Sequence, residues 1–184
     1  MQLETDNVMN NISMSKEECL NALQYASRSL PILNKNSAQE EDNQPYYIYD
    51  NGPSAYVLSN RIFDSIGLLD AILYVNSTGV WPSQENWTLF YTVRKALGDH
   101  ELLKYSRGNL LRHSEAELRV TLVQVCILNG WDFTLFCPKG TYAFLFNHDQ
   151  WFQCYESDKF NRQLTTKIDV FFKQYKHPSR PTWI

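Results

Sequence analysis

The pattern of hydrophobic and polar residues is interpreted as a period of two in three segments near the C-terminus, residues 131–137, 141–146 and 151–156, and it is clearest in "WDFTL". A period of two is typical of β-strands, because successive side chains point to opposite faces of a sheet. The turn-forming stretches "PKG" and "NHDQ" separate the three segments. Turns this short cannot connect parallel strands, so the pattern predicts an antiparallel three-stranded meander.

A helical period follows the predicted meander and indicates a final helix over residues 159–175. Its apolar positions are Phe160, Leu164, Ile168, Phe171, Phe172 and Tyr175. We expect this helix to cover one face of the meander.

Two capping boxes predict helix starts further upstream. The first, "SKEE" at 15–18, begins a helix that runs to about Ser29. The second, "SEAE" at 114–117, begins a helix that reaches Asn129. The first helix is expected to bury one face, made of Cys19, Leu20, Leu23, Ala26 and Leu30. The second is expected to bury Leu118, Leu122, Val125 and Cys126.

The remaining segments are assigned by composition and spacing. Apolar spacing favours helices at 61–75, 84–97 and 99–105, whereas 46–50 has strand composition and 106–113 is expected to be irregular. Residues 1–13 are expected to be a loose tail, and 34–45 a mobile acidic loop. Together the patterns predict an α+β fold: several helices with a C-terminal three-stranded antiparallel meander covered by a final helix.

Length and composition favour one globular domain spanning residues 1–184. Hydrophobic residues make up 43% and aromatic residues 14% of the chain, which is enough to build a core. The net charge is −3, and eight acidic but only three basic residues fall within residues 1–60. No stripe of basic residues that could follow a phosphate backbone stands out in the sequence, which disfavours a nucleic-acid partner.

The first ten residues, "MQLETDNVMN", carry acidic groups and no apolar run, unlike a signal peptide. No stretch of the sequence approaches the length of a membrane span. We therefore expect a cytoplasmic protein whose four cysteines stay reduced, and no membrane partner.

The stretch "FNHDQWFQCY" places His148, Asp149 and Cys154 within seven positions, which raises the possibility of a cysteine nucleophile with its base. The strand pattern argues against it. His148 and Asp149 fall in the predicted turn, and Cys154 lies well inside the next strand, roughly 15–20 Å away. Phe152 and Cys154 are expected on one face of that strand, and Trp151, Gln153 and Tyr155 on the other.

Other sites are disfavoured on spacing. The four cysteines have no CxxC spacing, and "DHE" at 99–101 lacks the i, i+4 arrangement of a helical metal site. Arg107, Arg112 and Arg119 are expected on a solvated surface. We predict no catalytic residue, no metal site and no cofactor.

The segment 129–158, "NGWDFTLFCPKGTYAFLFNHDQWFQCYESD", resembles in general style the immunity proteins that bacteria encode beside secreted toxins. The resemblance covers roughly the C-terminal half, and no functional residue carries over. It implies a non-enzymatic protein that neutralises a cognate protein toxin by stoichiometric binding.

Charge and aromatic content suggest which residues would bind that partner. Glu40, Glu41 and Asp42 would attract a basic toxin domain, while Trp81 and Trp151 would serve as aromatic anchors. Two alternatives stay open: an enzyme that pairs Cys137 or Cys154 with a histidine, and a regulatory or phage-derived interaction module.

Overall fold

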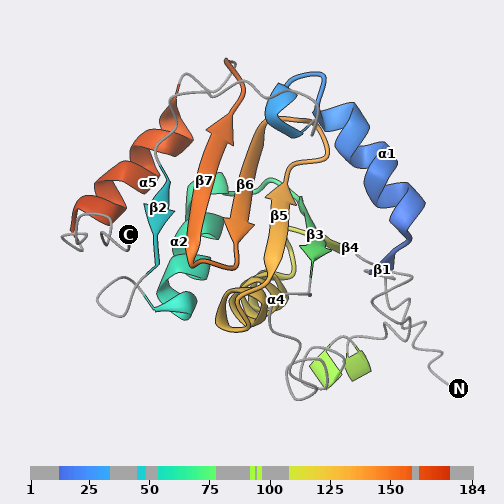
Figure 1. Cartoon of the computed structure of the whole chain (residues 1–184), viewed down its shortest axis with the longest axis horizontal. Coiled ribbons are helices and arrows are strands. Elements are labelled where there is room, and N and C mark those ends of the chain that lie inside the picture. The colour runs from blue at the N-terminus through green and yellow to red at the C-terminus, as the bar shows by residue number, and fades with distance from the viewer. Residues whose placement is uncertain are drawn as a thin grey trace, which may run out of the picture.

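The computed structural model describes residues 13–33, 45–48, 54–77, 92–93, 95–96, 108–158 and 162–174. These residues form a seven-stranded antiparallel sheet with helices on both of its faces (Figure 1). The expected α+β class is confirmed. The sheet is larger than the three strands predicted.

The strands follow the order β1-β4-β3-β5-β6-β7-β2 across the sheet. Their bounds are Ser13–Met14 (β1), Tyr46–Tyr47 (β2), Ala71–Ser77 (β3), Gly108–Leu111 (β4), Asp132–Phe136 (β5), Tyr142–Asn147 (β6) and Trp151–Glu156 (β7). The three strands predicted near the C-terminus are neighbours in this order, with β6 paired to both β5 and β7. Strands β3, β4 and β1 extend the sheet beyond β5, and β2 extends it beyond β7.

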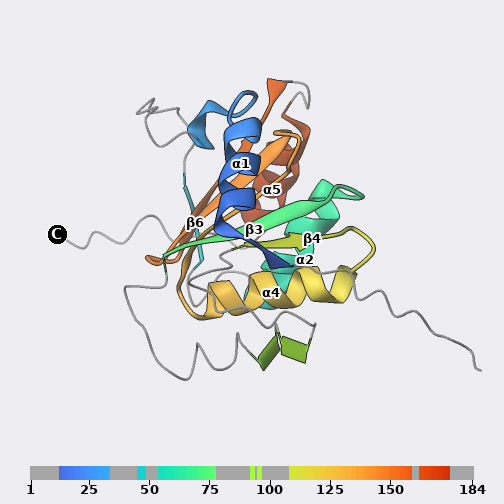
Figure 2. The same ribbon diagram turned by 90° about the vertical axis from the view of Figure 1, so that its right-hand side faces the viewer.

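The helices divide between the two faces. Their bounds are Lys16–Ala26 (α1), Ala55–Ile66 (α2), Ala116–Leu128 (α4) and Gln163–Lys173 (α5), and Pro31–Leu33 is a 3-10 turn, η1. Figure 1 shows α1 on one side of the sheet, with α2 and α5 on the opposite side. In Figure 2, α1 lies in front of the strands and α4 runs below them.

The face covered by α2, α4 and α5 holds the main core. Four aromatic rings form a ladder across four adjacent strands, where Phe133, Phe146, Phe152 and Tyr46 are register partners. Their ring centroids lie 4.2, 4.9 and 5.1 Å apart in turn, and all three pairs are stacked. The Tyr46 hydroxyl donates a 2.6 Å hydrogen bond to Asp169 and so links the ladder to α5. Packed aromatic pairs add stability beyond the area that they bury.

Helix starts are fixed by side chains close in sequence or far from it. The capping box predicted for α1 is present: the Glu18 amide donates to Ser15 Oγ, and the Ser15 amide donates to Glu18 Oε2. At the start of α5, Glu156 of β7 supplies the hydrogen-bond acceptor instead. Its Oε2 atom accepts from the Leu164 amide at 2.8 Å. This distant carboxylate replaces a local cap, because the N-cap residue Arg162 makes no side-chain capping bond.

The prediction of one helix over 61–75 was wrong. Residues 55–66 form α2 and residues 71–77 form β3. Gly67, with φ of +63°, ends the helix in a conformation that costs glycine little. The run from Ala71 to Val75 is buried on both faces of the sheet, so it has no period of two to distinguish it from a helix.

Three other predictions need correction. Residues 108–111, within the segment expected to be irregular, form β4 between β1 and β3. The second capping box is absent: the N-cap of α4 is Glu115, which has no side-chain capping bond and accepts from the Arg112 amide instead. Leu20, expected on the buried face of α1, is 46% exposed.

The first and last helices are shorter than predicted. Helix α1 ends at Ala26, before the expected Ser29, and α5 runs over residues 163–173 within the predicted 159–175. Its buried positions Leu164, Ile168, Phe171 and Phe172 agree with the prediction. Thr92, Val93, Lys95 and Ala96, the described part of predicted helix 84–97, are helical. The predicted helix 99–105 lies outside the described residues, as do the loop 34–44 and the tail except Ser13.

Candidate functional site

Among the described residues, α1 and the turn after it cover only part of the sheet face on their side. Ile72, Phe136, Ala143 and Tyr155 are register partners across four strands, and all are buried. They pack with Cys19, Ala26 and Leu30 from α1 and the turn that follows it. The helix therefore closes this end of the face, where Gly108 of β4 leaves room for the Cys19 side chain.

One step further along the strands, the same face opens into a groove of about 440 Å³. Its floor is the next row of register partners, Tyr74, Thr134 and Leu145. Its walls come from α1 and η1, through Leu20, Leu23, Gln24, Ser27, Ile32 and Leu33. The volume falls within the range of about 300–1,000 Å³ that small ligands occupy.

A polar pair lies in the floor of this groove. Asn76 also lines it, at a point where the register of β3 and β5 shifts between Val75 and Ser77. Such a bulge redirects a side chain relative to the regular pleat. The Asn76 Nδ2 atom donates a 3.0 Å hydrogen bond to Thr134 Oγ1, and Thr134 itself is buried.

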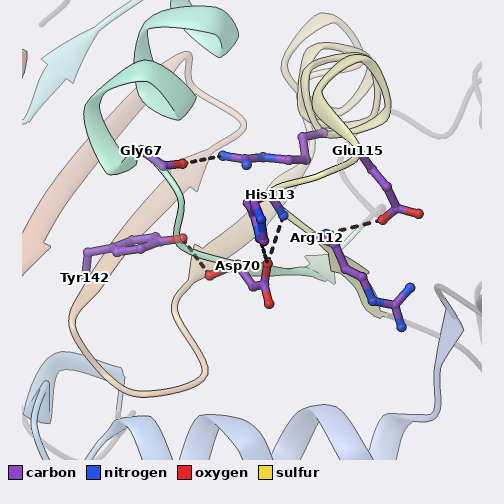
Figure 3. Close-up of polar contacts among 7 residues, drawn as sticks. Gly67, Asp70, Arg112, His113, Glu115 and Tyr142 are labelled. Carbon is purple, nitrogen blue, oxygen red and sulfur yellow. Dashed lines mark hydrogen bonds and ion pairs between the residues drawn. The ribbon is translucent and has the colours of Figure 1, made fainter.

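A second group of polar residues joins the α2–β3 loop to the start of α4 (Figure 3). Asp70 Oδ1 accepts from the His113 amide at 2.8 Å and lies 3.3 Å from His113 Nδ1. The backbone hydrogen bond, aided by the ring contact, lowers the pKa of Asp70 from its ordinary value. The buried Tyr142 hydroxyl donates to the carbonyl oxygen of Asp70 at 3.0 Å, and burial raises the pKa of Tyr142.

Arg119 of α4 belongs to the same group and is buried, which corrects the expectation of a solvated side chain. Its guanidinium lies 4.3 Å from the centre of the Phe63 ring, and Nη2 lies 3.5 Å from the carbonyl oxygen of Gly67. Burial lowers the pKa of Arg119, while Tyr142 and Asp70 oppose that shift. The arginine thus holds the C-terminal end of α2 against α4.

The Asp70–His113 pair has the geometry of a carboxylate that orients an imidazole. Both side chains are half-exposed. Within the described residues, no thiol or hydroxyl is hydrogen-bonded to His113. The pair joins the α2–β3 loop to the segment that precedes α4.

The structure places His148 in the turn between β6 and β7 and Cys154 inside β7, as the strand pattern predicts. Residues 148–150 connect β6 to β7, and His148 Nδ1 lies 2.9 Å from Asp132 Oδ1. Cys154 is buried on the aromatic face, where loss of solvation raises the pKa of its thiol. Burial raises the pKa of Cys19 to about 12 as well. Thiols with raised pKa values are poor nucleophiles at neutral pH.

Of the predicted partner-binding residues, the structure describes Trp151 alone. It is half-buried at the start of β7 and, by strand alternation, shares the face of the groove with Gln153 and Tyr155. Glu40, Glu41, Asp42 and Trp81 lie outside the described residues.

Sequence reasoning missed Asn76 and Thr134. A signal was present, because each is a polar residue next to or inside an otherwise apolar run, "AILYVN" and "FTLF". Only the pairing of β3 with β5 brings these two side chains together.

Two searches of the described residues gave negative results. The described residues contain no group of three or more His, Cys, Asp or Glu side chains that could hold a metal ion. Within the same ranges, no helix has the length and apolar character required to span a membrane.

Comparisons of the chain with protein-family models, with curated proteins and with solved structures find no match.

Proposed function

We propose that this chain is a cytoplasmic binding protein that neutralises a protein toxin by stoichiometric association. The observation that carries the proposal is the partly covered sheet face, with its groove between α1 and the β3-β5-β6 strands. Leu20, 46% exposed, stands at one side of the groove, and the half-buried Trp151 lies on the same sheet face. Aromatic and aliphatic side chains beside a recess are typical anchors of protein interfaces.

The toxin as partner rests on two features of the sequence. The segment 129–158 resembles immunity proteins, and acidic residues concentrate within residues 1–60. A toxin domain that acts on nucleic acid carries basic surface, so acidic groups on the binding protein would accelerate encounter.

Capture of a partner tests the proposal. The tagged full-length chain, expressed in its native cells, is expected to co-purify with one protein at a near-equal ratio. The captured protein should be toxic when expressed alone and harmless when co-expressed with this chain. A purified chain that captures no protein but turns over a small molecule would instead establish the enzymatic alternative.

Charge reversal tests the role of the acidic segment. Glu40→Lys, Glu41→Lys and Asp42→Lys together should slow association with the captured protein by about tenfold and weaken its salt dependence. The matched control reverses three exposed acidic residues elsewhere, Asp64, Glu117 and Asp158. Equal slowing by both triple variants would show that net charge acts and that the segment 40–42 has no specific role.

A further inference from the structure

The chemistry of the groove floor indicates what kind of group the groove accepts. The hydrogen bond from Asn76 Nδ2 to Thr134 Oγ1 uses one donor of the amide and leaves its carbonyl oxygen as an acceptor. The Thr134 hydroxyl accepts that bond and can still donate its own proton. A ligand with one donor and one acceptor side by side, such as the N–H and C=O of a single residue in an extended chain, would satisfy both atoms.

The walls favour an uncharged ligand. Every charged residue type is missing from the described side chains that line the groove, which are six aliphatic or aromatic residues with Gln24, Ser27, Asn76 and Thr134. A charged group that entered would lose water without gaining an ion pair, at a substantial cost in free energy. An apolar side chain has no hydrogen bonds to water to lose, and it would contact Leu23, Ile32 and Leu145.

The surroundings favour a segment of a protein over an isolated small molecule. The floor continues beyond Leu145 to its register partner Gln153 and, two residues along β7, to Trp151, both half-buried. An extended chain rises about 3.3 Å per residue, so a peptide whose side chain fills the groove would reach Trp151 within about three residues.

We infer that the groove receives an uncharged aliphatic side chain of a partner protein, with the backbone N–H and C=O of that same residue hydrogen-bonded to Asn76 and Thr134. The inference rests on the proposed function, because it names the contact that the partner makes on this face.

Three related probes test the chemistry without the partner. N-acetyl-leucinamide is neutral, N-acetyl-leucine carries a carboxylate and leucinamide carries an ammonium group, while all three share one side chain. Titrated into the isotope-labelled full-length chain, N-acetyl-leucinamide should shift the amide resonances of Leu23, Tyr74 and Leu145. The two charged probes should bind at least about tenfold more weakly.

Two variants test the assigned atoms. Thr134→Val removes the hydroxyl at nearly constant volume and should weaken N-acetyl-leucinamide about fivefold. Thr166→Val, at an exposed threonine of α5, is the matched control and should change nothing. Should Thr134→Val unfold, Leu20→Lys supplies a second test, because this exposed position accepts a charge. It should shift the preference toward N-acetyl-leucine by about fivefold.

Failure of this inference is distinguishable from failure of the proposed function. Equal affinity for all three probes, shifts remote from the groove, or a Thr134→Val protein that binds as well as the parent would each overturn the inference. Capture of a toxin that is unaffected by Thr134→Val and Leu20→Lys would also overturn it while leaving the proposed function intact. Selective binding of the neutral probe without any captured partner would support the groove chemistry and refute the proposed function.

Discussion

The two faces of the sheet are built from the same strands but differ in how completely helices cover them. On one face, the aromatic ladder of Phe133, Phe146, Phe152 and Tyr46 is closed by α2, α4 and α5. On the other, the row of Tyr74, Thr134 and Leu145 forms the floor of a groove that α1 leaves open. Stability thus resides mainly in the first face, and the second has room for a polar pair and for a partner.

Removal of α5 is expected to have the largest effect. Truncation after Ser157 deletes four buried side chains, Leu164, Ile168, Phe171 and Phe172. Burial of each contributes about 1.5–3 kcal/mol, and the sum is comparable to the whole net stability of a domain. The truncated chain should lack dispersed amide resonances and a cooperative thermal transition. A cooperative transition in that chain would show that the ladder face does not depend on its helix.

Two adjacent residues of β6 compare the faces directly. Phe146, 5% exposed, belongs to the ladder, and Leu145 points into the groove. Phe146→Ala should lower the free energy of unfolding by about 3–5 kcal/mol, whereas Leu145→Ala should cost only about 1 kcal/mol because that site is already partly open. Urea denaturation measures both. Equal losses would mean that the two faces are equally important for stability.

The closed end of the groove face includes a close approach between β4 and α1. A Cβ atom at Gly108 would collide with the Cys19 sulfur of α1. Gly108→Ala should therefore destabilise the chain by about 1–3 kcal/mol through overpacking. Cys19→Ala should relieve the collision. In the Cys19→Ala background, Gly108→Ala should therefore lower the free energy of unfolding much less than it does in the parent chain. A purely additive double-variant cycle would contradict this contact.

The smallest expected effect concerns the Asp70–His113 link. Because the folded-state pKa of Asp70 is lowered, its carboxylate stabilises the fold at neutral pH, and this contribution is lost as the pH falls through that pKa. Asp70→Ala should cost about 1 kcal/mol at pH 7, since the pair is half-exposed. The difference from the parent should shrink as the pH falls below the ordinary pKa of an aspartate, because the carboxylate is then progressively protonated. Asp64→Ala, at an exposed aspartate of α2, serves as control and should leave the free energy of unfolding at pH 7 nearly unchanged.

The open groove was not predictable from the strand patterns alone. Thr134 lies within a predicted strand, and Asn76 directly follows the predicted helix 61–75. Their hydrogen bond spans 58 positions in sequence. A contact between such distant residues depends on which strands pair, and strand pairing is not encoded in either local segment.

The sequence by itself determined the features that short-range physical rules control. These include the Ser15–Glu18 capping box, the turn at His148, the presence of strands at β5, β6 and β7, and the buried positions of α5. Each depends on residues within one or two helical turns, or on one period-two pattern. Only the tertiary structure decided that 71–77 and 108–111 are strands of the sheet, that Arg119 is buried, and that α1 covers one end of its face. The physical reason is that burial on both faces of a sheet removes the local periodicity, and the position of a covering helix is set by packing between residues far apart in the chain.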